Sequence, residues 1–435
     1  MAEFFGFGSD PANSGEKKVE YLELIYDLIF VYLIGRNNSL IQTVVNGFVP
    51  AEFFLTYILC TMIVIQIWML TTLFINRYGV NKKQEHLAIF INMYLLYFMA
   101  DGTRVHWQTH FYRYNIAWGL IILNLLLQYY LKYRQLKEQG DMCVEYNENG
   151  VAQLVCQPFF LRSAHVRRQM KILGVMAAII FISLPLYALT GIPFTPLAMI
   201  YCIIATVLSA NVNRLVAVDF SHLTERVMLY VVFTFGEMII GIAGYFGEPQ
   251  IGWRTIYFSL MAFLIVVGLF LSYGFVYDHV VDRRLNTNGT RYMLIHVFLI
   301  MAMSFITTGM EFMLEPKVAA LPKNVFLTAS FLMYFLCLSQ TVRFAKVQPE
   351  NAKKLQMELL AICGIFVILI ALTYRNGMAS IAVSVLFIYA VLAHLYLNWK
   401  KGQMLTAAAE QETIENVEAE GPMETPAENA EADRE

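Results

Sequence analysis

Hydrophobic residues recur along this chain in runs of about twenty, separated by shorter segments that carry most of its charged residues. A helix needs about twenty apolar residues to cross roughly 30 Å of hydrocarbon, because it rises about 1.5 Å per residue. Twelve runs meet or approach this length, at residues 21–45, 51–75, 86–101, 114–133, 169–190, 195–213, 222–246, 253–277, 291–314, 322–343, 355–374 and 377–398. The pattern predicts an all-α polytopic membrane protein with about twelve transmembrane helices.

The composition agrees with this class. Of the 435 residues, 58% are hydrophobic and only 15% are charged, whereas soluble domains have about 25% charged residues. A net charge of −2 gives no electrostatic basis for binding nucleic acid. The first eighteen residues contain no apolar stretch typical of a cleavable signal peptide. The expected partners are the lipid bilayer and an unidentified small solute or ion, and the oligomeric state stays open.

The distribution of Lys and Arg predicts the orientation. If the N-terminus lies inside, 23 of the 31 Lys and Arg residues fall on the inner side and six on the outer side. Only Arg36, within the first helix, and Arg434, near the C-terminus, remain unassigned. Cytoplasmic loops carry the positive excess in membrane proteins. We therefore predict a multi-pass protein of the cell membrane with both termini in the cytoplasm.

The predicted helices divide the chain into four parts. These are a cytoplasmic N-terminal segment at 1–20, a first six-helix half at 21–216, a second six-helix half at 217–400 and a cytoplasmic tail at 401–435. From Glu410 to Glu435 the tail has ten acidic residues and one Arg. So few large apolar residues accompany them that we expect the tail to be disordered.

A cytoplasmic loop at 134–168 joins the fourth and fifth helices. Its Asn149-Gly150 pair is a strong signal for a two-residue hairpin turn. Counting outward from this turn places Cys143 directly opposite Cys156. In the reducing cytoplasm both are expected to be free thiols, with a redox pair or a metal clip as the alternatives.

The two halves show a weak internal duplication. An offset of 202 residues places Glu23 on Glu225 and the first helix on the seventh. The ends of the following helices also correspond, at 74–78 and 275–279. Because each half has six helices, an even number, both halves would enter the membrane in the same direction. The sequence thus predicts two parallel pseudo-repeats related by an axis along the membrane normal.

Several motifs resemble one bacterial family. They are Leu22-Glu-Leu-Ile-Tyr-Asp-Leu-Ile-Phe-Val31, His222-Leu-Thr-Glu225-Arg226 with Gly236-Glu237, and Tyr292-Met-Leu-Ile-His296. In these stretches the chain is similar to the bacterial low temperature requirement A proteins over roughly residues 19 to 400. It departs from them after Asn76-Arg77, where an aspartate-rich run is replaced by Tyr78-Gly-Val-Asn-Lys82. The resemblance implies an integral protein of the bacterial inner membrane, named from a growth phenotype, and implies no settled biochemical activity.

Two carboxylates in the first apolar run are the first candidates for a site. Glu23 and Asp27 are four residues apart, so a helix places both on one face. A carboxylate near the bilayer centre costs from about 2.5 to more than 10 kcal/mol unless it faces the bundle interior, water or a counter-charge. Both residues are therefore expected to face the inside of the helix bundle.

The parallel duplication predicts which charges lie at the same depth. Glu23 is level with Glu225, beside Arg226, and the position next to Arg36 is level with Glu237. We therefore expect two ion pairs between the first and seventh helices, Glu23 with Arg226 and Arg36 with Glu237. Arg226 and Glu237 are eleven residues apart and lie within about 20° of one helix face. An alternative is that these pairs only fix the packing of helices.

Asp27 has no charged equivalent in the second half, because the offset matches it to Leu229. We expect Asp27 to lack a partner and to face water or a ligand, as a proton or cation site. His222, one turn before Arg226, is a candidate proton carrier, or else a structural or solvated residue near the interface. His296 is a further candidate, with interhelical hydrogen bonding as its alternative role.

The sequence favours transport over catalysis. It has no Gly-rich phosphate loop, no His-Glu-x-x-His pair and no Gly-x-Ser-x-Gly turn, so we expect no enzyme, cofactor or metal site. The first hypothesis is a secondary transporter, with H+ as a candidate coupling ion. Pro185 is expected to kink the fifth helix and to free carbonyls that line a cavity. A passive cation channel is the second, because lysosomal two-repeat potassium channels also join two six-helix halves. A membrane protein that organises lipid is the third.

Overall fold

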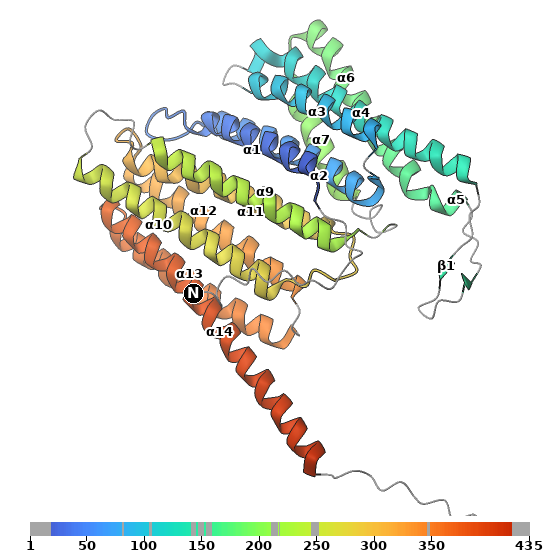
Figure 1. Ribbon diagram of the computed structural model, residues 1–435. Coiled ribbons are helices and arrows are strands. Elements are labelled where there is room, and N and C mark those ends of the chain that lie inside the picture. The colour runs from blue at the N-terminus through green and yellow to red at the C-terminus, as the bar shows by residue number, and fades with distance from the viewer. Residues whose placement is uncertain are drawn as a thin grey trace, which may run out of the picture.

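The computed structural model describes residues 19–80, 82–103, 107–140, 145–146, 152–153, 159–209, 216, 218–244, 252–345 and 349–419. Within these residues the regular secondary structure is helical except for one short strand pair (Figure 1). The elements are α1 (Tyr21–Ile41), α2 (Ala51–Tyr78), α3 (Lys83–Gly102), α4 (Trp107–Gln139), β1 (Glu145–Tyr146), β2 (Ala152–Gln153), α5 (Phe159–Arg162), α6 (Ala164–Thr190), α7 (Thr195–Leu208), α9 (Phe220–Ala243), α10 (Trp253–Phe275), η2 (Val276–Val280), α11 (Thr290–Leu314), α12 (Ala320–Thr341), η3 (Val342–Phe344), α13 (Pro349–Thr373) and α14 (Gly377–Ala419). Each of the twelve predicted stretches overlaps one of these helices, with bounds that differ by several residues.

Eight helices of the described chain are long and apolar enough to cross a membrane. They correspond to α2, α4, α6, α9, α10, α11, α12 and α14. The polytopic membrane class is therefore confirmed, whereas a total of twelve spans stays a prediction. α1 is less apolar because it contains Glu23, Asp27 and Arg36, and α7 has only 14 residues.

α2 and α11 form the centre of the bundle. Most of the apolar stretch of each is buried inside the protein, as expected of helices that are hydrophobic on all sides. α2 packs against α1, α4, α7, α9 and α11, and α11 packs against α1, α9 and α12. α3, α4 and α6 lie together on one side, and α10, α13 and α14 lie on the other (Figure 1).

α1 packs directly against α9, so the predicted contact between the first and seventh helices is confirmed. The offset of 202 also relates α2 to the following helix of the second half. Added to the bounds of α2, 51 and 78, it gives 253 and 280, the range that α10 and η2 cover together. The two-repeat arrangement as a whole remains a prediction.

The loop between α4 and α6 contains a strand pair whose register differs from the prediction by one residue. β1 and β2 are antiparallel, with Glu145 opposite Gln153 and Tyr146 opposite Ala152. The two-residue turn would have placed Tyr146 opposite Gln153, so the predicted register is wrong. Cys143, Cys156 and the Asn149-Gly150 turn lie outside the described residues.

The tail predicted from residue 401 begins inside α14, and its disorder stays a prediction. α14 continues to Ala419. Residues 401–419 are rich in Ala, Glu and Gln, all strong helix formers, and this propensity extends the helix that 377–398 begins. Residues 420–435 lie outside the described part. α6 runs through Pro185 without ending there.

Candidate functional site

Four ionisable side chains meet where α1 packs against α9. Glu23 and Asp27 are one turn apart on α1, and His222 and Arg226 are one turn apart on α9. Because residues four apart share a helix face, each helix presents two of them to the other. Glu23 is 2% exposed, and the other three are fully buried. We call these four residues the charged cluster.

Arg226 joins both carboxylates of the charged cluster. Its Nη1 lies 3.1 Å from Glu23 Oε2. Its Nη2 donates to Asp27 Oδ1 at 2.9 Å and its Nε donates to Asp27 Oδ2 at 3.2 Å. The planar guanidinium thus forms a two-pronged contact with Asp27, a geometry that a lysine cannot reproduce. The predicted Glu23–Arg226 ion pair is confirmed.

The prediction that Asp27 lacks a partner is wrong. Besides its contacts with Arg226, its Oδ1 accepts a hydrogen bond from Trp68 Nε1 on α2 at 2.7 Å. The offset of 202 residues predicted Glu23 as the only partner of Arg226. The guanidinium is long enough to contact two carboxylates that are one helical turn apart. Asp27 is therefore fixed in place between α1, α2 and α9.

His222 lies deep in the protein, so a solvated position for it is excluded. Its Nε2 is 3.3 Å from Glu23 Oε2, and its Nδ1 is 3.0 Å from Asn76 Nδ2. Asn76 is oriented by the backbone of Asp219, whose N–H donates to Asn76 Oδ1 at 3.0 Å and whose carbonyl accepts from Nδ2 at 2.9 Å. Because the amide group thus donates to Nδ1, the neutral imidazole carries its proton on Nε2, facing Glu23.

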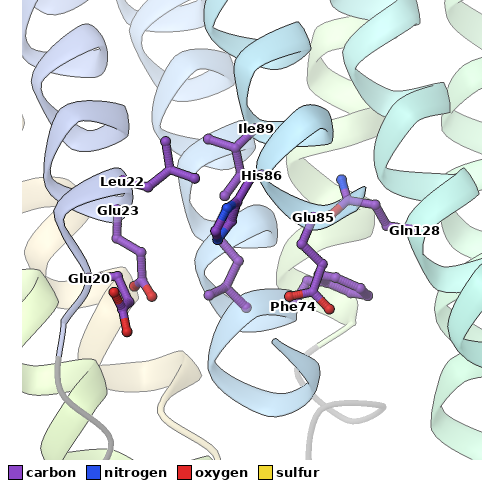
Figure 2. A pocket seen from close by; sticks show the side chains of 9 residues that line it. Glu20, Leu22, Glu23, Phe74, Glu85, His86, Ile89 and Gln128 are labelled. Atoms are coloured by element: carbon purple, nitrogen blue, oxygen red, sulfur yellow. The ribbon is translucent and has the colours of Figure 1, made fainter. Parts of the chain in front are cut away.

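A small cavity reaches Glu23 from the end of the helices. Its volume is about 10 Å³, close to the 10–15 Å³ that one water molecule needs. It is lined by Glu20, Leu22, Glu23, Phe74, Ile75, Glu85, His86, Ile89 and Gln128. Figure 2 shows Glu20, just before α1, near Glu23 of α1, with His86 of α3 across from them. Of the charged cluster, Glu23 is the residue that lines this cavity.

A family model described as bacterial low temperature requirement A protein (LtrA) matches residues 18–397. The chain belongs to this family. The resemblance inferred from the sequence motifs is thereby confirmed over most of the chain. Comparison with curated proteins and with solved structures gave no match.

Two motifs of this LtrA protein supply the charged cluster. The motif at 22–31 contributes Glu23 and Asp27, and the motif at 222–226 contributes His222 and Arg226. Glu225, which the predicted offset of 202 matches to Glu23, is half-buried, and the structure shows no ion pair between Glu225 and its neighbour Arg226.

The predicted Arg36–Glu237 pair is wrong. Arg36 is exposed, and the described residues show no ion pair between it and Glu237. The Glu237 carboxylate instead lies against Gly35, where an added Cβ would be 2.5 Å from Oε1. The missing side chain of Gly35 lets this carboxylate approach the backbone of α1, while Arg36, about 100° further round the helix, points elsewhere.

His296 of this LtrA protein makes one hydrogen bond within α11 and one to α10, away from the charged cluster. Its Nδ1 donates to the Tyr292 carbonyl at 2.8 Å, so its Nε2 accepts from Tyr273 on α10 at 3.3 Å. The hydrogen-bonding alternative is confirmed for this residue.

Sequence reasoning missed three residues that position the charged cluster. Asp219 caps α9, because its Oδ1 accepts from the His222 N–H at 3.0 Å, and an Asp just before an apolar run is a recognisable cap signal. Trp68 and Asn76 lie within the long apolar helix α2. Neither has a local pattern in the sequence that indicates which way its side chain points.

Proposed function

We propose that this LtrA protein is a secondary transporter that moves an ion or small solute, coupled to a proton, through a site between its two halves. The proton would be held on Glu23, which the His222 Nε2–H faces. The single observation that carries the proposal is that a buried ion-pair network joins α1 of the first half to α9 of the second and places the Glu23 carboxylate 3.3 Å from His222 Nε2.

The charge count follows from the contacts. Glu23 and Asp27 contribute two negative charges and Arg226 contributes one positive charge. Counting only these four residues, with His222 neutral, the charges sum to −1. Uncompensated charge in a low-dielectric interior is costly, so a proton on Glu23 would bring the sum for these four residues to zero.

The geometry separates a fixed part of the cluster from an exchangeable part. Asp27 is held by Arg226 and Trp68 and does not line the small cavity. Glu23 lines that cavity and touches both His222 and Arg226. A role in helix packing alone explains the contacts of Asp27. It does not explain why Glu23 and His222 contact each other beside a water-sized cavity.

Protonation of Glu23 would weaken the contact between α1 of the first half and α9 of the second half. Glu23 belongs to α1 and its partners belong to α9, so a neutral Glu23 would release one of the charged links between them. A proton-dependent link at the interface of two halves is the kind of two-state element that alternating access requires. The proposal includes twelve spans, parallel halves, cytoplasmic termini and the inner membrane as its setting.

The test is flux in proteoliposomes that contain a pH-sensitive dye. We expect saturable proton movement when a pH gradient is combined with one member of a panel of inorganic ions and small metabolites. Glu23→Gln and His222→Gln should each abolish the coupled proton movement. Glu225→Gln is the matched control, because it makes the same chemical change next to Arg226 but outside the charged cluster.

Three outcomes would contradict the proposal. The first is the absence of flux under every gradient, which would favour a role in organising lipid. The second is a large ion current that does not saturate, which would favour a channel. The third is coupled flux in Glu23→Gln equal to that in Glu225→Gln, which would remove the charged cluster from the mechanism.

A further inference from the structure

A second and larger cavity lies beside the small one, at the same end of α2, α3 and α4. Its volume is about 400 Å³. Its lining residues are Phe74, Tyr78, Lys82, Gln84, Glu85, Leu87, Ala88, Ile91, Asn124, Leu127, Gln128, Leu131, Lys132, Arg134, Gln135 and Glu138. Three of these, Phe74, Glu85 and Gln128, also line the small cavity. We call this larger cavity the α3–α4 groove.

In the part of the chain that the structure describes, the two lysines at the end of the α3–α4 groove form no ion pair with the two acids that line it. Glu85 accepts a hydrogen bond from the Val80 N–H at 3.0 Å, and Glu138 lies 3.6 Å from Arg134 of its own helix. Lys132 Nζ donates to a neutral group, the Gln135 side chain, at 3.3 Å. Lys82 is exposed and shows no ion pair in the described part of the chain.

The two lysines act on one another electrostatically. The positive charges of Lys82 and Arg162 oppose that of Lys132, and the negative charge of Glu85 favours it. Lys132 Nζ also lies 5.6 Å from the ring of Tyr78. Two like charges that line one groove favour an anion between them.

The rest of the α3–α4 groove is apolar and open. Leu87 and Ile91 on α3 and Leu127 and Leu131 on α4 line it and are all exposed. From Lys82 to Ile91 the chain advances nine residues into the apolar part of α3, roughly 13 Å at 1.5 Å per residue. Cationic groups therefore lie at the end of the helices and apolar ones lie deeper.

We propose that the α3–α4 groove binds an anionic phospholipid of the surrounding leaflet. The lipid phosphate lies between Lys82 and Lys132, and an acyl chain follows Leu87 and Leu131. Basic pockets between membrane helices bind acidic headgroups in this way. The order of charged and apolar groups along the groove matches that of a headgroup and its chain, and does not match a small soluble anion. This inference stands independently of transport.

The experiment measures lipid binding to the detergent-purified full-length protein by native mass spectrometry, with phosphatidylglycerol and phosphatidylcholine as probes. We expect phosphatidylglycerol to bind more tightly. The double variant K82Q/K132Q should bind it about thirtyfold more weakly, since one lysine near a membrane surface contributes about a fivefold change. K400Q/K401Q, which removes the same charge from exposed positions on α14, should bind it as the natural protein does.

Two further measurements keep the proposal testable. K82R/K132R keeps the charge and should retain phosphatidylglycerol. Glycerol 3-phosphate, which has the phosphate but no acyl chain, should not compete at concentrations equal to that of the lipid. Equal binding of the two lipids, unchanged binding by K82Q/K132Q, or full competition by glycerol 3-phosphate would each overturn the proposal.

Discussion

Asp27→Asn is the substitution that the charged cluster should tolerate least. The change keeps the size of the side chain but removes its charge. Arg226 then loses a carboxylate that accepts hydrogen bonds from its Nε at 3.2 Å and its Nη2 at 2.9 Å. Trp68 can keep its hydrogen bond, because an Asn oxygen accepts as well. Arg226 is left with Glu23 as its remaining carboxylate partner in the cluster.

The magnitude follows from these contacts. Breaking a buried ion pair by removing one partner costs about 3–5 kcal/mol, and the loss of two charge-assisted hydrogen bonds is of the same order. We therefore expect Asp27→Asn to lower the free energy of unfolding by about 3–5 kcal/mol. Glu225 is half-buried and lies outside the cluster. Glu225→Gln should therefore change the free energy of unfolding by about 0.5 kcal/mol or less.

The assay is reversible unfolding in mixed micelles of increasing SDS content, followed by circular dichroism. Combining Asp27→Asn with Arg226→Met gives the decisive comparison. Because the double variant removes both members of the pair, its loss should be smaller than the sum of the two single losses. A loss of under about 1 kcal/mol for Asp27→Asn, or additive single losses, would refute the reasoning.

Two further predictions use the same unfolding assay. Gly289, just before α11, has a φ of +67°, and a Cβ there would lie 2.2 Å from Leu223 Cδ2, so Gly289→Ala should cost at least the 1–2 kcal/mol of left-handed strain. In contrast, Gly35→Ala should cost less, because the atoms it meets are the flexible end of Glu237; a greater loss for Gly35→Ala would contradict this. Asn76→Ala leaves His222 Nδ1 and the Asp219 N–H without the partners they have now, so it should cost about 1–3 kcal/mol. A neutral effect would show that Asn76 does not orient His222.

Run length and hydrophobicity were enough to predict the helices, because a bilayer requires long apolar segments whatever their packing. Depth along the helix axis was also predictable. The contact between Glu23 and Arg226 follows from matching positions in α1 and α9, which pack side by side.

Rotation and reach of side chains were not predictable from the sequence. Arg226 spans one helical turn and therefore binds Asp27 as well as Glu23, which the depth match did not anticipate. Arg36 and Glu237 lie at similar depth. Because Gly35 has no side chain, however, the Glu237 carboxylate packs against the backbone of α1 at Gly35 and, in the described part of the chain, forms no ion pair with Arg36. Trp68 donates to Asp27 from the middle of an apolar helix, and its neighbours in sequence do not reveal that direction.

The most direct test of the central claim is the protonation of His222, measured by ¹⁵N NMR on the histidine-labelled protein in lipid, with the signal assigned through His222→Gln. The account predicts a neutral imidazole with its proton on Nε2 and with Nδ1 unprotonated. It also predicts His222 ¹⁵N shifts that change in Glu23→Gln and stay the same in Glu225→Gln. A proton on Nδ1 of the neutral ring, or ¹⁵N shifts indifferent to Glu23→Gln, would contradict a proton held on Glu23 beside His222 Nε2.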